Sequence, residues 1–396
     1  MILKNKKILI GVSGGIAAYK TCELIRALVK SDCDVQVVMT DASQHFVTPL
    51  TFETLTGHEV HNDPFGHSTK HIDLARWADC IVVSPATANT IARVAAGIAD
   101  NLLTTLITAA DVPVIFCPAM NVHMYLNPIF QANMAKLKSL TYHFVEADQG
   151  ELACGEQGWG RLAEIAHIVD TIKCVVNEKK ELKGNRVLVT AGPTEENIDP
   201  VRFLSNRSSG KMGFALAEAA AIHGADVTLI SGPNSLRPFS SVEYREIRSA
   251  KQMYDEVFAH WDETDMLIMA AAVSDYTVAH VHDHKIKKSE NVTSIALNRT
   301  HDILFEAGQK KGNRILVGFA LETQNGLDNA KLKLHEKQLD MIVLNDATEK
   351  GAGFGNNTNR VTLIDNESHV TELPLMEKCE VAHKIIEYII KHIKSA

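Results

Sequence analysis

Short apolar runs alternate with longer amphipathic segments along the first half of the chain. Nearly uninterrupted apolar runs are typical of parallel strands that are covered on both faces. Such runs lie at Lys7–Val12, Val35–Met39, Cys80–Ser84 and Val114–Cys117. Apolar residues at helical spacing fall between them, at Ala17–Ser31 and Thr87–Ala96. This alternation of strand and helix predicts a doubly wound α/β sheet.

The pattern stops in a charged segment and then starts again. Residues 175–184 read VVNEKKELKG, a composition that suits an exposed linker, which we place at residues 173–184. Beyond it the chain predicts a helix at Ser209–His223 and strands at Arg186–Thr190, Asp226–Ile230, Met266–Ala271 and Ile315–Phe319. We therefore predict two α/β domains, residues 1–180 and 181–396.

The end of the chain carries a hairpin signal and a last helix. Val361–Ile364 and His369–Leu373 flank the polar segment DNES, which predicts two antiparallel strands joined by a turn. Pro374 precedes a helix in which Val381, Ile385 and Ile389 share one face, and we expect that face to be core.

Composition narrows the class of protein. Of 396 residues, 45% are hydrophobic and 22% are charged, which excludes wholesale disorder. The net charge of −8 argues against nonspecific binding to nucleic acid or to an anionic membrane. The 7 cysteines are scattered and form no C-x-x-C pair, as expected of reduced thiols in a cytoplasmic protein. No run approaches the roughly 20 apolar residues that a transmembrane helix needs.

Two turns in the first half are candidates for a ligand site. Gly11–Ala17 (GVSGGIA) and Ser84–Asn89 (SPATAN) both follow predicted strands and consist of small or hydroxylic residues. Each could be a phosphate cradle or simply a tight turn, although two in one sheet favour a ligand. The first departs from G-x-G-x-x-G at Ser13, which disfavours a nicotinamide reductase.

Three other positions in the first half could carry chemistry. His67 and His71 are four residues apart, but no acidic or cysteine partners accompany them, so a metal site is disfavoured. Asn121, in PAMN, follows a strand and places an amide at the same edge of the sheet. Cys154 lies in a Gly-rich stretch, where it is either a reactive thiol or a small core residue.

The second half has a polar run and several lysines. The segment SNRSSGKMG (205–213) fails the P-loop pattern at Ser205 and Met212. It is either an N-cap run, with Ser208 or Ser209 capping the helix, or an anion site strengthened by Arg202 and Asn206. Lys333 and Lys337 share a helix face and would suit a triphosphate, although such basic runs are more often solvated surface.

The motifs of the first half, taken in order, resemble the flavin-dependent cysteine decarboxylases, specifically the phosphopantothenoylcysteine decarboxylases. They are GGIAAYK (14–20), KHIDL (70–74), SPATAN (84–89), PAMN (118–121) and ACGE (153–156). The resemblance implies a flavodoxin-like domain that binds FMN, which oxidises the substrate's thiol so that the neighbouring carboxylate can leave. It also implies a base-like His71, a carboxylate anchor in Asn121 and a proton donor in Cys154. Leu162 replaces an expected Met, a change that conserves volume.

The same resemblance implies two sets of binding residues in the first half. Substrate would contact Met120. FMN would contact Ser13, Gly14, Gly15, Thr40, Ser84, Ala86 and Thr87.

The motifs of the second half resemble the phosphopantothenate–cysteine ligases. They are AGPTE (191–195), PVRFLSNRSSGKMG (200–213), AAVSDY (271–276), KIKK (285–288), GFALET (318–323) and LND (344–346). The resemblance implies a second, Rossmann-like α/β domain in which CTP with Mg²⁺ activates the phosphopantothenate carboxylate as an acyl-cytidylate. Cysteine would then displace CMP. Arg202 and Asn206 would hold this intermediate, and Asn206 and Lys285 would be catalytic.

The nucleotide residues that the ligase resemblance implies span 270–337. They are Ala270, Ala271, Asp275, Lys285, His301, Asp302, Ile303, Leu304, Phe319, Lys333 and Lys337. The segment RTHDIL (299–304) departs from the family, since His301 stands where Pro is expected. A turn without that proline is less rigid.

The order of the two halves is that of the fused bacterial enzymes. The resemblance therefore implies ligation of cysteine to 4'-phosphopantothenate followed by decarboxylation to 4'-phosphopantetheine, in coenzyme A biosynthesis. It also implies a large homo-oligomer. The alternative is a flavin-binding regulatory subunit without catalysis, which the presence of His71, Asn121 and Cys154 disfavours.

Overall fold

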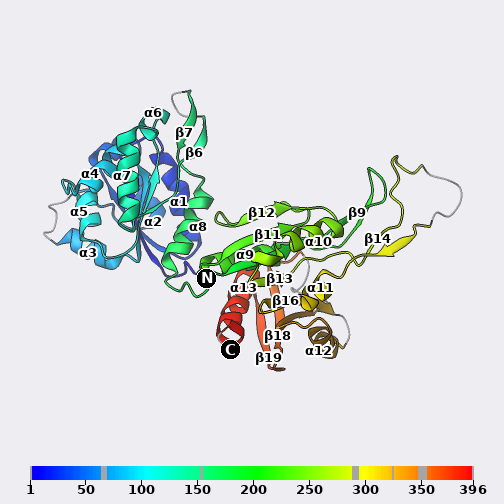
Figure 1. The fold of residues 1–396 in the computed structure, drawn as a ribbon. Coiled ribbons are helices and arrows are strands. Elements are labelled where there is room, and N and C mark those ends of the chain that lie inside the picture. Colours follow the sequence, from blue (N-terminus) through cyan, green and yellow to red (C-terminus); the bar gives the residue numbers. More distant parts are fainter. Residues whose placement is uncertain are drawn as a thin grey trace. The chain divides into compact units, whose positions relative to one another are not determined.

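The chain divides into two compact units, Met1–Glu178 and Lys179–Ala396 (Figure 1). The computed structural model describes residues 2–63, 69–151, 155–287, 294–322, 325–346 and 355–394. Helix α8 (Ile165–Val176) occupies the start of the segment predicted as linker, so the charged connection is shorter than expected. No helix in the described part of the chain has the length and apolar character needed to cross a bilayer.

The first unit is built on a five-stranded parallel sheet of order β2-β1-β3-β4-β5. Its strands are β1 (Lys7–Val12), β2 (Asp34–Met39), β3 (Cys80–Ala86), β4 (Val114–Pro118) and β5 (His143–Phe144). Its other helices are α1 (Ala18–Lys30), α2 (Pro49–Thr56), α3 (Lys70–Trp77), α4 (Ala88–Ala96), α5 (Leu102–Ala109), α6 (Val122–Tyr125) and α7 (Pro128–Ser139), with a 3₁₀ turn at Asp41–His45.

Alternate residues of the central strand β1 face two different cores. Ile8 and Ile10 pack with residues of α1, α2 and α8, whereas Leu9 packs with residues of α3, α4, α5 and α7. Side chains alternate across a strand, so a continuously apolar strand needs a helical layer on each face. The apolar runs of the sequence therefore predict this three-layer arrangement correctly.

An antiparallel hairpin, β6 (Asp148–Glu151) and β7 (Gln157–Arg161), stands beside α6 in the first unit (Figure 1). Gly160 of this hairpin accepts a hydrogen bond from the Met120 backbone N–H at 2.9 Å. Gly160 has φ of +126°, and a Cβ there would lie 2.2 Å from the Met120 oxygen. Only glycine permits this close contact between the hairpin and the segment after β4.

The second unit contains an eight-stranded mixed sheet of order β12-β11-β8-β13-β16-β17-β18-β19. Its parallel strands are β8 (Arg186–Ala191), β11 (Asp226–Ser231), β12 (Glu243–Glu246), β13 (Met266–Met269), β16 (Ile315–Glu322) and β17 (Met341–Asp346). The predicted hairpin is present as β18 (Thr358–Asp365) and β19 (Val370–Glu377), and Pro374 lies within β19.

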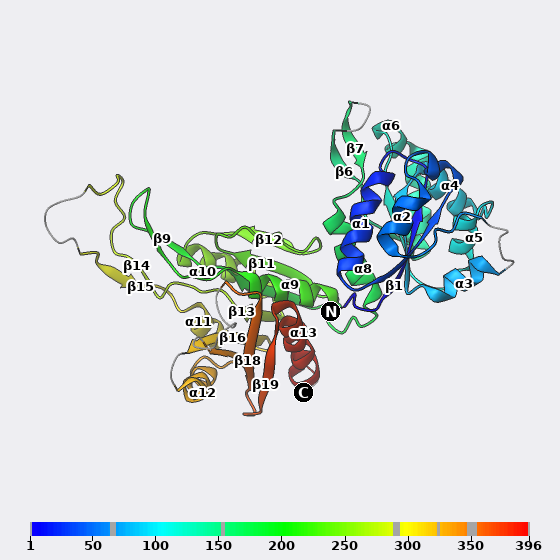
Figure 2. The same cartoon turned by 180° about the vertical axis from the view of Figure 1, so that it is seen from behind.

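Helices cover both faces of this second sheet. On one face α9 (Lys211–Ile222) packs against α13 (Lys378–Tyr388), as both ribbon views show (Figure 2). The other face carries α10 (Ala250–Ala259), α11 (Ile303–Gln309) and α12 (Gly326–Glu336), whose apolar residues form one core with β13 and β16. Val381, Ile385 and Ile389 are fully buried, which confirms the predicted core face of the last helix.

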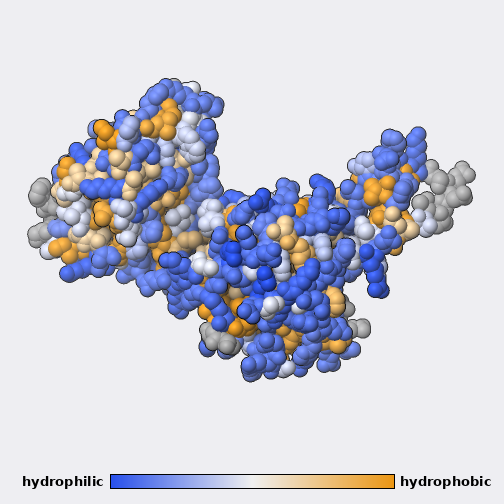
Figure 3. Space-filling model, in the orientation of Figure 1, coloured by the Kyte–Doolittle hydropathy of each residue, from blue (hydrophilic) through white to orange (hydrophobic). Residues whose placement is uncertain are grey.

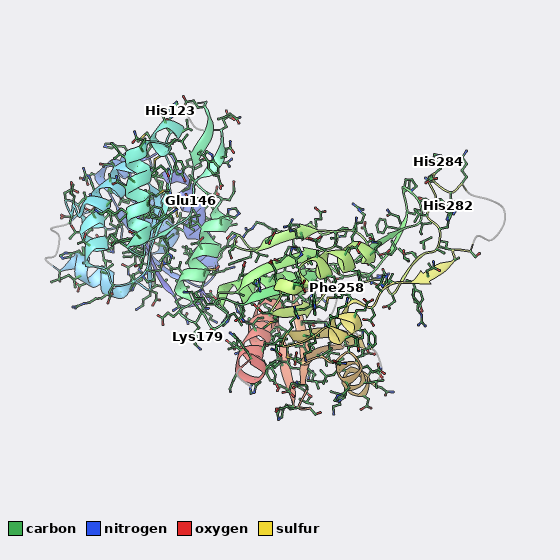
Figure 4. All side chains as sticks on the ribbon, viewed as in Figure 1. His123, Glu146, Lys179, Phe258, His282 and His284 are labelled. Carbon is green, nitrogen blue, oxygen red and sulfur yellow. The ribbon has the colours of Figure 1, made fainter. Side chains whose placement is uncertain are left out.

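Two short ribbons extend from the second sheet as an arm. One pairs β9 (Glu195–Asn197) with β10 (Phe203–Ser205), and the other pairs β14 (Tyr276–Val278) with β15 (Leu297–Arg299). The backbone N–H of His282 donates to the Ile198 oxygen at 3.0 Å, which fastens the two ribbons together. We call residues 195–205, 276–287 and 294–299 the arm; Figure 4 shows His282 and His284 far out on it.

Candidate functional site

The turns after β1 and β3 meet at the carboxyl edge of the first sheet. Ser13 is 1% exposed; its Oγ donates to the Pro85 oxygen at 2.7 Å and accepts from the Thr87 N–H at 3.0 Å. In a sheet of order 2-1-3-4-5 the crossovers change direction between β1 and β3, and open α/β sheets bind ligands at that point. The structure thus brings Ser13, Ala86 and Thr87 together where the sequence predicts a cofactor.

The turn after β2 completes this region. The Oγ1 atom of Thr40 is buried and has no hydrogen-bond partner among the described residues. A Cβ on Gly14 would lie 2.5 Å from the Ala42 Cβ, whereas one on Gly15 would only touch Thr87 at 3.5 Å. Gly14 therefore allows the turns after β1 and β2 to approach each other. A hydroxyl or phosphate group of a ligand would supply a hydrogen-bond partner for Thr40 Oγ1.

Ser84 lies at the base of the same region. It is fully buried on β3, next to the Cys117 thiol of the neighbouring strand β4. Burial raises the pKa of Cys117, so this thiol stays protonated. It is a core residue rather than a nucleophile.

The predicted decarboxylation residues lie on different elements of the first unit. His71 is half-buried in the first turn of α3, and Asn121 is the N-cap of α6, with its Oδ1 accepting from the His123 N–H at 2.8 Å. His67 and Cys154 lie outside the described residues. Asn121 keeps its side-chain NH₂ for another partner.

That partner is a carboxylate on the hairpin. Asn121 Nδ2 donates to Glu156 Oε2 at 2.5 Å, and His123, labelled in Figure 4, places Nε2 3.9 Å from Glu156 Oε1. The amide is thus oriented to bind a carboxylate. Sequence reasoning did not single out Glu156, although it ends the ACGE motif.

The second unit holds a cavity of about 840 Å³ at the carboxyl edge of β13, β16 and β17. Of the predicted nucleotide residues, only Lys285 is not part of its wall. Asn206 also lines it and donates Nδ2 to the Ala272 oxygen at 3.0 Å. The structure therefore assembles in one cavity residues that are more than a hundred positions apart in the chain.

Helix α9 begins beside this cavity later than predicted. Gly210, with φ of +76°, is its N-cap, and no side chain caps the helix. Neither Ser208 nor Ser209 is the cap; the Ser208 Oγ instead accepts from the Gly210 N–H at 3.3 Å. A Cβ on Gly213 would lie 2.5 Å from that of Ala191, so α9 sits very close to β8. The left-handed conformation of Gly210, which turns the chain into α9, is one that glycine adopts easily.

Arg202 and Lys285 lie on the arm. Arg202 donates Nε at 2.9 Å and Nη2 at 2.5 Å to Asp199, and Nη2 also donates to the Ile286 oxygen at 2.9 Å. The Arg202 guanidinium holds the pKa of Asp199 far below its usual range. Lys285 is exposed next to Ile286. The arm thus brings Arg202 and Lys285 near each other, outside the cavity wall.

The two predicted nucleotide lysines at the end of α12 already have carboxylate partners. Lys333 donates to Glu322 at 2.6 Å, and Lys337 lies 2.8 Å from Asp302. The bond from Lys333 contributes most to lowering the pKa of Glu322. In the divergent segment, His301 Nδ1 lies 3.2 Å from Glu306, and its ring lies 4.6 Å from that of Tyr254. No cluster of metal-binding side chains occurs among the described residues.

Two family models divide the chain between them. Residues 2–177 match the flavoprotein family, and residues 182–393 match the C-terminal domain of the DNA/pantothenate metabolism flavoproteins. A coenzyme A biosynthesis bifunctional protein of Bacillus subtilis (strain 168) is 48% identical over 395 residues, covering 98% of this chain and 97% of that relative. The corresponding protein of Haemophilus influenzae is 43% identical over 396 residues, covering 99% and 98%.

Two further matches cover a smaller share of this chain. A cysteine/cysteine sulfinic acid decarboxylase of an unknown prokaryotic organism is 47% identical over 354 residues, covering 87% of this chain and 99% of that protein. The crystal structure of the C-terminal domain of a coenzyme A biosynthesis bifunctional protein is 42% identical, with a TM-score of 0.48. It covers 55% of this chain and 100% of that chain.

Proposed function

The chain belongs to the family of bifunctional coenzyme A biosynthesis proteins, and from this premise we propose that its two units catalyse successive reactions. Residues 181–396 join cysteine to 4'-phosphopantothenate, using CTP. Residues 1–180 then decarboxylate the product, phosphopantothenoylcysteine, to 4'-phosphopantetheine. The observation that carries this proposal is the similarity to bifunctional relatives along nearly the whole of both units.

FMN is the proposed cofactor of the first unit. When bound, it supplies the oxidation of the substrate's thiol that lets the neighbouring carboxylate leave, and then the matching reduction. Ser13, Gly14, Gly15, Ser84, Ala86 and Thr87 would form the walls of its site. The buried hydroxyl of Thr40 supports the proposal, because it has no partner among the described residues and could bond to the cofactor.

Three side chains of the first unit act on the substrate. Asn121 binds the carboxylate that is lost, with Met120 beside it, and its bond to Glu156 supports this role. His71 accepts and holds a proton close to the reacting cysteine portion. Cys154 donates the proton that completes the product.

The second unit uses its cavity for the nucleotide and its arm for the acyl group. Residues 270–275, 301–304, Phe319, Lys333 and Lys337 surround CTP, whose phosphates carry Mg²⁺. Asn206 orients the activated carbonyl, because it lines the cavity and its amide is already held by Ala272. Arg202 and Lys285, both on the arm, bind the acyl portion of the acyl-cytidylate intermediate.

The arm is also the proposed contact between copies of this chain. Six apolar side chains on it are between 42% and 58% exposed: Val201, Phe203, Tyr276, Val281, Ile295 and Leu297. Hydrophobic surface is visible on the arm in Figure 3. Apolar residues gathered in this way on a soluble protein mark an interaction surface. A homo-oligomer in the cytoplasm would cover them.

Assays of the purified chain test the proposal. With 4'-phosphopantothenate, cysteine, CTP and Mg²⁺, we expect pyrophosphate, CO₂ and 4'-phosphopantetheine, from a protein with the absorption spectrum of a flavin. A parallel reaction contains free cysteine alone, the substrate type named for one relative. CO₂ from free cysteine, with none from phosphopantothenoylcysteine, would overturn the assignment. A flavin spectrum without either activity would favour the regulatory alternative.

A further inference from the structure

Two lysines outside the predicted set of nucleotide residues line the cavity of the second unit. Lys211 begins α9 and Lys378 begins α13, and both belong to the cavity wall. Lys211 Nζ donates to Asn357 Oδ1 at 2.7 Å and to the Gly355 oxygen at 3.0 Å. The Lys378 backbone N–H donates to the Asn357 oxygen at 2.8 Å. Asn357 therefore holds the two helix starts together at one end of the cavity.

Lys378 is buried to an unusual degree for a lysine. It is 8% exposed, and its pKa is lowered first by burial and then by the charge of Lys211. Two cations that face one cavity repel each other, and a buried cation is costly unless an anion or a hydrogen-bond network compensates it. A cavity that places two ammonium groups together therefore favours an anionic ligand.

The other lysine pair of the cavity is electrostatically different. Lys333 lies on α12 and Lys337 is the C-cap of that helix, on the opposite face of the sheet from α9 and α13. They pair with Glu322 and Asp302. Among the described residues, Lys211 Nζ instead donates to an amide oxygen and a backbone carbonyl, neither of which carries a negative charge. An incoming polyphosphate is consequently favoured at the end with Lys211 and Lys378.

We propose that Lys211 and Lys378 bind the terminal phosphoryl groups of the nucleotide, the part that leaves as pyrophosphate. The proposal rests on the ligase function proposed above. When a carboxylate oxygen bonds to the α-phosphorus, the bond from that phosphorus to the bridging oxygen breaks, and the electron pair remains on pyrophosphate. Two ammonium groups beside that oxyanion stabilise the charge as it develops.

Binding measurements on the full chain test this site. Calorimetric titration with CTP, CMP, inorganic pyrophosphate and 4'-phosphopantothenate, all with Mg²⁺, compares the wild type with Lys378→Met and Lys211→Gln. The matched control is Lys384→Gln, on the same helix as Lys378 and paired at the surface with Glu387 at 3.0 Å. Both test variants should bind CTP and pyrophosphate about tenfold or more weakly, the loss expected for one charged hydrogen bond.

CMP and 4'-phosphopantothenate should bind all variants equally. Unchanged CTP affinity in both variants, an equal loss for CMP, or a loss confined to 4'-phosphopantothenate would overturn the proposal. A wild type that binds pyrophosphate through these lysines but not CTP would refute the ligase assignment and keep the anion site. Binding of neither would refute the site.

Discussion

Asn121 donates its side-chain amide to Glu156 at 2.5 Å, so the proposed anchor for the substrate's carboxylate already holds a carboxylate of this chain. The two residues come from different elements, the start of α6 and the β6–β7 hairpin. The Glu156 side chain is about half exposed, which leaves room for it to be displaced. Substrate and Glu156 would compete for the same N–H group.

Glu156→Gln should therefore lower the KM for phosphopantothenoylcysteine by about two- to tenfold, the value of one exchanged hydrogen bond. The neutral side chain introduced at position 156 accepts a hydrogen bond more weakly than the Glu156 carboxylate does. Substrate therefore displaces it from Asn121 at a smaller cost in free energy. CO₂ release at varied substrate concentrations measures the effect. Glu151→Gln, on the opposite strand of the hairpin, is the control and should leave KM unchanged. A KM for Glu156→Gln that rises would mean that the hairpin carboxylate assists binding.

His71→Asn should reduce CO₂ release by about 100-fold or more while CTP-dependent ligation continues, since general base catalysis contributes about that much. The basis is the division of the chain at Glu178, which puts His71 and the nucleotide cavity in different units. Pyrophosphate and CO₂ are measured in the same reaction. An equal fall in both products, with the circular dichroism spectrum preserved, would contradict the two-site arrangement.

Gly14→Ala should lower the free energy of unfolding of the FMN-free first unit by about 1–3 kcal/mol, the usual cost of overpacking. The new Cβ would lie 2.5 Å from the Ala42 Cβ and would push apart the turns after β1 and β2. Gly15→Ala is the matched control, because its Cβ would meet Thr87 at an ordinary 3.5 Å. Urea unfolding of both variants without cofactor gives the comparison. Equal free energies of unfolding for the two variants would mean that the turn after β2 moves away from the new Cβ at little cost.

The sequence predicts the strands best where burial alone decides them. Strand β1 begins and ends at the predicted residues. Its apolar run is bounded by charged and small residues, and such a run is buried as a central strand with both faces covered. The start of α9 was wrong by two residues, since the serines resemble caps while Gly210 adopts the left-handed conformation. Local composition does not show which backbone conformation a glycine takes.

Residues that meet only through tertiary contacts escaped prediction. Lys378 follows β19 and looks like an ordinary helix lysine, and only the packing of α13 on α9 brings it beside Lys211. Glu156 likewise stands 35 residues from Asn121. Motifs located the cavity, because parallel strands deliver their loops to one edge, but they could not show which side chains neutralise one another there.

The last prediction concerns Asn206, which we expect to act after the nucleotide has reacted. Its Nδ2 donates to the Ala272 oxygen at 3.0 Å, so the amide is held at the cavity wall. In Asn206→Asp a carboxylate would face that carbonyl oxygen, and the repulsion would displace the group that orients the activated acyl carbonyl.

Asn206→Asp should accordingly form acyl-cytidylate from CTP and 4'-phosphopantothenate but transfer it to cysteine about 100-fold more slowly, as expected of a small misplacement. Lys285→Gln, which removes a cation of the arm, should instead block formation of the intermediate. Each variant is incubated with labelled CTP, Mg²⁺ and 4'-phosphopantothenate, and the products are separated before and after cysteine is added. If Asn206→Asp released no pyrophosphate while Lys285→Gln accumulated acyl-cytidylate, the two roles would be reversed. The cavity would then hold the group that activates the carboxylate, and the arm the group that directs cysteine.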